Sequence, residues 1–482
     1  MPADIDFRII IDGINKGLAP LAHIDTETYI GDVGHASEMK ADIISLPGFL
    51  TQSPALVDLT NGDQEGAVSE LIRFILEQPT NAAGTLTYAI GATKLFELNA
   101  TTVIEGGDPV WPQAVTNMTE GESLVRLSNK LYGFFNKAAG GDILQMDLTT
   151  KIIDHTWGSV ADAALEKAPH PVAVKEDVMV FGNGQYLGVY IEGLATLNVQ
   201  QLDFGSGAEV ADVLFHSNYW WIAVNYGDRK SQMFMYDGSA LSNILLDETG
   251  MGMQKIGFLY VYNGVIYVTY TDTTSGGYTI GYLSGRVIKS LRYFSGSLPT
   301  HRQKTLYKNT IIFISSTDVW SFGASVEQLP AQISKLADGG HATVGGLAAP
   351  FGTPLVASSD GGDNHRLAKF SGYSTDSEWK SLFIDISADR RLGKIHTVIV
   401  STKPLVGDAK ATIQIEGNQG QEAAKPTTAL EIAGVNKTRH LFRSIGLPSV
   451  EDVRVLLSYS TGDATDTCPI RKVVLLGNFI EN

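Results

Sequence analysis

Residues 257–283 read GFLYVYNGVIYVTYTDTTSGGYTIGYL, and this stretch decides the fold class. Asn263 and Gly264 lie between two runs of Val, Ile and aromatic residues. The pair predicts a two-residue hairpin, because a type I′ turn needs two residues that tolerate positive φ. Such a turn sets the cross-strand neighbours on both faces of the ribbon. They are Val261 with Ile266 and Leu259 with Val268 on one face, and Tyr260 with Tyr267 and Phe258 with Thr269 on the other.

Neither face of this hairpin is polar, so both faces must be covered. A second turn over residues 273–277 leads into a third strand at residues 278–283. Small antiparallel sheets packed face to face around a ring satisfy this demand, which is the arrangement of a β-propeller. Two facing sheets of a sandwich are the alternative.

Strand–turn–strand units recur along the chain at spacings of about 36 to 55 residues, within the range of propeller blades. They begin near Gly84, Leu124, Asp177, Asp212, Gly257, Thr305 and Gly345. Turn pairs recur with them, at Ser128-Asn129, Asn183-Gly184, Asn263-Gly264 and Lys308-Asn309. We therefore predict an irregular propeller of six or seven blades over residues 61–375. Residues 65–77 have apolar positions at helical spacing, but the start of the repeat slightly favours an innermost strand.

The two ends of the chain differ from this repeat. Residues 1–60 contain turn signals without a repeat, and we expect an extended arm that either makes assembly contacts or laces the domain. From Trp379 onward, strand-like runs alternate with polar loops. This alternation of strands and polar loops predicts a β-sandwich or jelly roll over residues 376–482. The expected fold class is therefore all-β, with a propeller followed by a C-terminal sandwich.

Composition excludes several classes of protein. The 482 residues include 36 basic and 52 acidic side chains, a net charge of −16, which argues against a protein that grips nucleic acid through its phosphates. The same charge suits a wall past which DNA slides without adhesion. The single cysteine, Cys468, excludes an internal disulfide. The N-terminus lacks the apolar core of a signal peptide, so we expect synthesis in a cytoplasm.

Enzyme motifs are sparse. The sequence has no phosphate loop, zinc-ligand spacing, EF-hand loop or nucleophile elbow. Residues 358–362 (SSDGG) fit the start of the Asp-box turn of sialidase-like propellers, but His365 replaces the expected aromatic residue. A glycosidase needs a pair of carboxylates, and the candidates near blade edges are Asp177, Asp203, Glu209, Asp212, Asp247 and Glu248. We expect no catalytic residues, no cofactor and no metal.

Two smaller features have competing interpretations. Asp360, Asp363 and Asn364 offer oxygen ligands for calcium, although a solvated turn explains them as well. His170 lies in a stiff Pro-His-Pro segment before a strand, where a lone histidine is expected to be structural.

Basic residues gather at residues 298–308 (LPTHRQKTLYK) of this acidic chain. Arg302, Lys304 and Lys308, with His301 beside them, are candidates for contact with DNA phosphates or an acidic partner. A solvated loop between blades is the alternative.

The whole chain resembles the tail proteins of bacteriophages, in particular the propeller-based nozzle proteins of short-tailed phages. The resemblance rests on the opening LPGFLTQSPALVDLTNG (46–62), the blade series, and the final strands VEDVRVLLSYS (450–460) and CPIRKVVLLGNFI (468–480). It implies a virion component, assembled in the host cytoplasm, in which several copies, six in the known nozzles, form a ring below the tail adaptor.

The resemblance further implies contacts with the adaptor or portal complex and with fibres, and DNA that passes without sequence-specific binding. No gate loop is identified in the sequence. A carbohydrate- or receptor-binding propeller and a propeller glycosidase or lyase are the rival interpretations.

Overall fold

The computed structural model describes residues 5–12, 36–42, 49–61, 68–104, 118–154, 157, 165–227, 230–244, 254–271, 276–308, 310–322, 331–335, 343–360, 364–374, 377–387, 391–405, 407–460 and 467–480. Over these residues the protein is all-β, apart from short 3₁₀ turns such as Glu192–Leu194 and Asn418–Gly420. The chain divides into two compact units. Unit 1 comprises residues 1–56, 318–335 and 370–482, and unit 2 comprises residues 57–317 and 336–369.

Unit 2 is built from small sheets, most of them four-stranded and antiparallel. The first sheet contains β4 (Thr60–Asn61), β5 (Phe74–Ile75), β6 (Thr87–Ile90), β7 (Leu95–Leu98) and β8 (Thr102–Ile104). The second contains β9 (Met118–Leu127), β10 (Lys130–Lys137), β11 (Gly141–Asp147) and β12 (Ile153–Asp154), and the third contains β13 (Val172–Lys175), β14 (Val178–Asn183), β15 (Tyr186–Ile191) and β16 (Thr196–Asp203). The fourth contains β17 (Ala208–His216), β18 (Tyr219–Tyr226), β19 (Gln232–Tyr236) and β20 (Leu241–Ile244).

The remaining sheets of unit 2 follow in chain order. The fifth sheet contains β21 (Lys255–Tyr262), β22 (Val265–Thr271), β23 (Tyr278–Ser284) and β24 (Val287–Phe294). Next comes the pair of β25 (Lys304–Tyr307) and β26 (Thr310–Ser315). The last sheet contains β29 (Thr343–Ala348), β30 (Leu355–Ser359), β31 (His365–Tyr373) and the earlier strand β3 (Pro54–Asp58).

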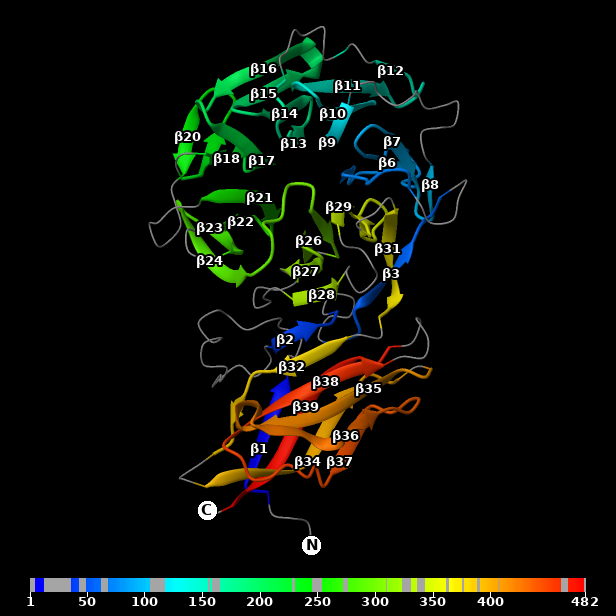
Figure 1. Ribbon diagram of the computed structural model, residues 1–482, viewed down its shortest axis with the longest axis vertical. Helices are drawn as coiled ribbons and strands as arrows, with labels where there is room; N and C mark the ends of the chain where they lie inside the picture. Colours follow the sequence, from blue (N-terminus) through cyan, green and yellow to red (C-terminus); the bar gives the residue numbers. More distant parts are fainter. Residues whose placement is uncertain are drawn as a thin grey trace. The chain divides into compact units, whose positions relative to one another are not determined.

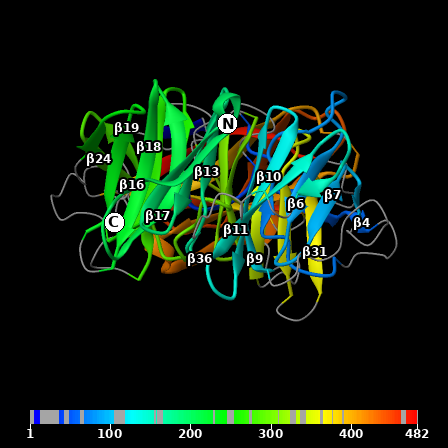
Figure 2. The ribbon, with the colours of Figure 1, turned by 90° about the horizontal axis from the view of Figure 1, so that it is seen from above.

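These sheets surround a common centre (Figure 1). In the view turned by 90°, the strands of unit 2 stand beside one another (Figure 2). Each sheet contacts the next in chain order, through β5 with β9, β9 with β13, β13 with β17, β17 with β21, β21 with β26, and β25 with β29. The last sheet then contacts the first, through β29 and β5, so the series closes on itself. This arrangement is propeller-like and confirms the all-β prediction.

The apolar faces explain this closure. Five hydrophobic clusters among the described residues of unit 2 each combine side chains from two neighbouring sheets. In β18, Trp220 packs toward the sheet of β13–β16, whereas the next residue, Trp221, packs toward the sheet of β21–β24. Adjacent strand residues point to opposite faces, so the sheet of β17–β20 is covered on both sides. Sheets with two apolar faces, such as the one that contains the β21–β22 hairpin, need this arrangement.

The hairpin predicted around Asn263 and Gly264 forms as expected. Leu259 pairs with Val268, Tyr260 with Tyr267 and Val261 with Ile266. The turn residues Asn263 and Gly264 have φ values of 48° and 76°. The expected pairing of Phe258 with Thr269 is wrong, because the register shifts between Ile256 and Leu259; the Phe258 amide donates instead to Thr269 Oγ1, at 3.0 Å.

Two other local predictions need correction. The turn expected at Asn183-Gly184 lies one residue later, because Asn183 pairs with Tyr186 as the last residue of β14. Gly184, with φ 57°, therefore occupies the first turn position. In residues 68–77, the described part of the helix-or-strand segment, the favoured innermost strand forms as β5, but it spans only Phe74–Ile75, and Val68 forms an isolated bridge.

Unit 1 contains two sheets. One has the order β1 (Phe7–Asp12), β39 (Ile470–Ile480), β34 (Leu392–Thr402) and β37 (Arg439–Arg443). The other runs through β27 (Asp318–Phe322), β28 (Ala331–Lys335), β2 (Ala36–Lys40), β32 (Glu378–Ser381), β38 (Asp452–Ser460), β35 (Lys410–Gly417) and β36 (Glu422–Ile432), with β33 (Ile384–Asp385) paired to β38. The N-terminal strand β1 lies along the C-terminal strand β39 for its whole length.

Candidate functional site

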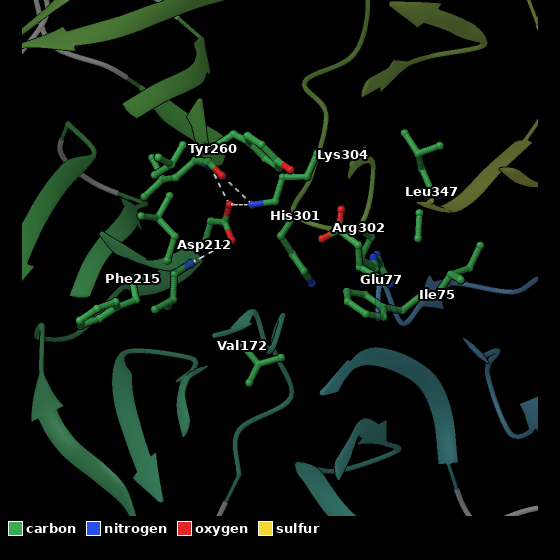
Figure 3. A pocket seen from close by; sticks show the side chains of 16 residues that line it. Ile75, Glu77, Val172, Asp212, Phe215, Tyr260, His301, Arg302, Lys304 and Leu347 are labelled. Atoms are coloured by element: carbon green, nitrogen blue, oxygen red, sulfur yellow. Dashed lines mark hydrogen bonds and ion pairs between the residues drawn. The ribbon is translucent and has the colours of Figure 1, made fainter. Parts of the chain in front are cut away.

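Unit 2 encloses a cavity of about 300 Å³ at the centre of its sheets (Figure 3). Its walls come from the inner strands β5, β13, β17, β21, β25 and β29, together with the turn before β25. The polar side chains that line it are Glu77, Asp212, Tyr260, His301, Arg302 and Lys304. Residues far apart in sequence meet here because six of the sheets contribute their innermost strands.

Asp212 and Lys304 form an ion pair at this cavity, and their side chains point toward one another in Figure 3. Asp212 Oδ2 also accepts a hydrogen bond from the Leu259 amide at 2.6 Å, and Oδ1 accepts from the Val213 amide at 2.9 Å. Lys304 Nζ donates to the Leu259 carbonyl at 2.7 Å. The pair therefore ties β17, β21 and β25 together.

Burial opposes the charge on Asp212, and it raises the pKa of this carboxyl, while Lys304 and the backbone amides act in the other direction. The side chain of Lys304 is 14% exposed and that of Asp212 is 3% exposed. Lys304 Nζ also lies 5.6 Å from the centre of the Phe258 ring, a distance that allows a cation–π contact. Both carboxylate oxygens of Asp212 are thus occupied by contacts within the protein.

A second charged cluster adjoins the cavity through Arg302. Arg302 Nη1 lies 3.3 Å from Glu120 Oε1 and 3.6 Å from Glu122 Oε2, and Arg73 Nη1 lies 2.6 Å from Glu120 Oε1. Glu122 Oε1 accepts from Asn136 Nδ2 at 2.9 Å. Burial raises the pKa of Glu122 to about 7, against the opposing effect of Arg302.

Two histidines lie beside this cluster. His301 Nε2 is 3.3 Å from the Glu122 carbonyl oxygen and 3.4 Å from Ser123 Oγ. The Ser123 hydroxyl donates instead to the His170 carbonyl, so its proton is not directed at an imidazole. Burial lowers the pKa of His301 well below its usual value and that of His170 to about 4. Both rings are therefore neutral at pH 7, as expected of buried structural histidines.

Glu77 completes the polar lining. Its Oε1 accepts from Thr305 Oγ1 at 2.8 Å and from the Leu306 amide at 3.2 Å, which joins the segment after β5 to β25. Tyr260 and Phe215 add aromatic surface to the wall (Figure 3). Burial raises the pKa of Tyr260, so its hydroxyl stays protonated.

The structure separates the three basic residues that the sequence grouped. Arg302 and Lys304 lie at the cavity, where their side chains are 21% and 14% exposed and paired with acidic groups. Lys308 is exposed, away from the cavity lining, with Nζ 5.0 Å from the centre of the Tyr307 ring. Their contact with DNA or an acidic partner stays a prediction.

The candidate carboxylates are also dispersed. Asp212 lines the cavity, but Asp177, Asp203 and Glu209 are not among its lining residues. Asp247 and Glu248 lie outside the described residues.

Sequence reasoning missed three cavity carboxylates: Glu77, which lines the cavity, and Glu120 and Glu122, which reach it through Arg302. The available signal was the pattern Thr-Glu-Gly-Glu-Ser at the start of β9, which places charges on a strand otherwise buried on both faces.

The incomplete Asp-box lies at the end of β30. Ser358 and Ser359 are buried in that strand, and Asp360 Oδ2 accepts from Asn364 Nδ2 at 2.7 Å. Residues 361–363 lie outside the described part, and with them Asp363 of the calcium hypothesis. In the described ranges no cluster of three His, Cys, Asp or Glu side chains is arranged to hold a metal ion. Nor do these ranges contain a helix with the length and apolarity that a membrane crossing requires.

No known family matches this sequence, and no curated protein matches it either. Among solved structures, the extracellular domain of a protein described as a hybrid two-component system from B. thetaiotaomicron is 11% identical with a TM-score of 0.48, over 74% of this chain and 44% of that one. This chain thus spans about half the length of the first structures that it matches.

An oligogalacturonate lyase from Vibrio parahaemolyticus is 9% identical with a TM-score of 0.43, over 68% of this chain and 98% of the lyase. An exo-β-1,3-galactanase from Phanerochaete chrysosporium is 9% identical with a TM-score of 0.31, over 88% of this chain and 100% of the galactanase. At these values the likenesses carry no argument about function.

Proposed function

We propose that this protein is a structural component of a bacteriophage tail, a nozzle or tail-tip ring that retains packaged DNA and then lets it pass. The observation that supports this best is the interior of unit 2, where charged pairs join neighbouring inner strands. Asp212 and Lys304 link three sheets, and Arg302 links Glu120 of β9 to the turn before β25. Charged side chains that already bind one another favour a rigid wall, because a substrate site would need side chains that are free to bind the substrate.

The full architecture that we propose is a seven-bladed propeller followed by a β-sandwich. The sheets that begin with β5, β9, β13, β17, β21, β25 and β29 supply the blades. In unit 1, the sheets that contain β34 and β38 each bury one face, with Val398 and Val400 in β34 and Val453 and Val455 in β38 fully covered. Burial of one face per sheet is what a two-layer sandwich requires.

In this proposal six copies form a ring in the virion, assembled in the host cytoplasm below the adaptor or portal complex and beside the fibres. The net charge of −16 supports a passage that DNA traverses without adhesion. DNA would then be contained by the shape of the assembly, with no sequence-specific contact.

Mass spectrometry of gradient-purified particles from cells that express this chain tests the proposal. We expect about one copy for every two portal subunits, the ratio of a sixfold ring on a twelvefold portal. Particles that lack the chain, while it is free in the medium or cytoplasm, would overturn the tail assignment.

Carbohydrate binding is the second candidate, and the lining of the cavity favours it. Tyr260 and Phe215 offer aromatic surface beside the charged groups Glu77 and Arg302, in about 300 Å³. Sugars stack on aromatic rings while charged groups bind their hydroxyls. A glycan array with wild type and Tyr260→Ala tests this candidate: binding that the substitution abolishes supports it, and no binding to any glycan excludes it.

A further inference from the structure

The sheet β1-β39-β34-β37 of unit 1 has two different faces. The register places Ile11, Val473, Val400 and His440 in one row across the four strands, and all four side chains are buried. The residues that alternate with them point to the other face, because successive side chains of a strand lie on opposite sides of a sheet.

An apolar row crosses this second face. It consists of Ile10, Val474, Ile399 and Leu441, paired in that order across the strands. Ile10 and Leu441, at its two ends, are 41% and 50% exposed, whereas Val474 is 3% exposed and Ile399 is half-buried, so the exposed apolar surface lies at the ends of the row. Ile480, which is 38% exposed, lies on the same face further along β39. Exposed apolar side chains that gather on one face, where scattered ones need no explanation, indicate an interaction surface.

Basic side chains flank the apolar row on both sides. One flanking row contains Arg8, Leu476, Thr397 and Arg443, and the other contains Asp12, Lys472, Ser401 and Arg439. Four of these residues are basic and one, Asp12, is acidic. Among the described residues, neither Arg439 nor Arg443 forms an ion pair with Asp or Glu, and both are exposed.

The distribution of charge along the chain indicates which kind of surface this basic face complements. Residues 370–482 contain equal numbers of acidic and basic side chains, so the whole net charge of −16 belongs to residues 1–369. A basic face with exposed apolar side chains on its two edge strands is therefore complementary to the acidic surface of another copy of the same chain.

We propose that this face, defined by Arg8, Ile10, Ile399, Arg439, Leu441, Arg443 and Lys472, docks onto a second copy of this protein. The contact is heterologous, because a basic apolar face meets an acidic surface elsewhere on the neighbour, and such contacts generate rings when the rotation closes. The inference deepens the proposed tail ring by naming the surface through which its copies associate.

Sedimentation velocity of the purified full chain, at low and high salt, tests this docking. We expect wild type to associate at about 0.05 M salt and to dissociate at about 1 M, where charges are screened. Arg439→Glu/Arg443→Glu should raise the concentration needed for association at least about tenfold, because like charges would then face one another. Leu441→Ser should weaken association without any change of charge.

Arg286→Glu/Lys289→Glu is the matched control, since it makes the same change of charge at exposed positions of unit 2. This control should associate as wild type does, and unchanged unfolding midpoints will confirm that all variants fold. A chain that stays monomeric at every salt concentration, or whose association ignores Arg439 and Arg443, overturns the inference.

The outcome is separable from that of the tail assignment. A monomeric chain that is nevertheless present in particles would refute the docking face and leave the tail role standing. A chain absent from particles that associates through this face would do the reverse. Association only with another tail protein would also refute the proposal of a second copy.

Discussion

At the scale of single residues, the Asp212–Lys304 pair is the feature on which the interior of unit 2 depends most. A buried ion pair adds little net stability over a well-packed apolar pair, but removal of one partner leaves a charge stranded in a medium that cannot solvate it. Asp212 is the residue whose charge would be left unpaired, because it is almost fully buried and Lys304 is its only cationic contact in the described part of the chain.

Lys304→Met should therefore destabilise the protein by about 3–5 kcal/mol in denaturant-induced unfolding. Methionine keeps most of the apolar stem and removes the charge, together with the hydrogen bond to the Leu259 carbonyl. Lys308→Met is the control, because Lys308 is exposed, and its unfolding free energy should stay within about 0.5 kcal/mol of wild type.

The double variant Asp212→Asn/Lys304→Met removes both charges and keeps one side-chain oxygen, which can accept from the backbone amide of either Val213 or Leu259. It should be more stable than Lys304→Met alone. Equal stability of Lys304→Met and wild type would show that the pair does not hold the inner strands.

Glu122 predicts a dependence of stability on pH. Its pKa in the folded protein, about 7, lies above the ordinary value of 4.5, so between these values the folded state holds more protons than the unfolded state. The contribution of this group to the free energy of unfolding therefore falls as pH rises from about 4.5 to 7, by on the order of 3 kcal/mol.

Glu122→Gln should remove this fall while it keeps the acceptor for Asn136. Unfolding curves of both proteins at several pH values give the difference. The lowered pKa values of His170 and His301 make the free energy of unfolding rise with pH below about pH 6.5, which is the opposite direction. Both histidines are present in both proteins, so their contribution cancels in the difference. A difference that does not change with pH would contradict the raised pKa.

At the scale of elements, the β21–β22 hairpin shows how a turn sets a register. Gly264 has φ 76° and nothing lies within 4 Å of the position that a Cβ would occupy. The effect of an added methyl group is therefore confined to the backbone. Gly227 offers the same open space without a positive φ.

Gly264→Ala should cost about 1–2 kcal/mol in the free energy of unfolding, because an L-residue is strained in the left-handed region. Gly227→Ala, the matched control, should be neutral or slightly stabilising. Equal effects at the two positions would mean that the turn relaxes to another type.

At the scale of the whole molecule, charge decides what the chain can bind. A protein with a net charge of −16 should show no measurable affinity for a DNA duplex of about 30 base pairs at about 0.1 M salt, as followed by fluorescence anisotropy. The same should hold for Lys308→Glu. If wild type bound DNA and Lys308→Glu weakened that binding, the result would support the predicted contact of Lys308 with DNA. It would contradict the proposal that DNA passes the protein without adhesion.

The local pattern of the chain was sufficient for much of the fold. The Asn263-Gly264 hairpin and the repeated apolar strands predicted sheets covered on both faces, because turn chemistry and side-chain alternation act over a few residues. The same reasoning misplaced the turn at Gly184 by one residue, because the side chain of Asn183 is recruited into the strand end, where it binds the Glu166 amide and the Val199 carbonyl.

The sequence by itself determined the all-β class, the period of the repeat and the acidic balance, since these depend on neighbouring residues and on composition. Only the tertiary structure decided which charges meet. Asp212 and Lys304 come together across 92 positions of the chain, and β1 pairs with β39 at the opposite terminus. Contacts of that kind depend on how the sheets close into a ring and pair at their edges, and no local pattern of residues encodes the partner.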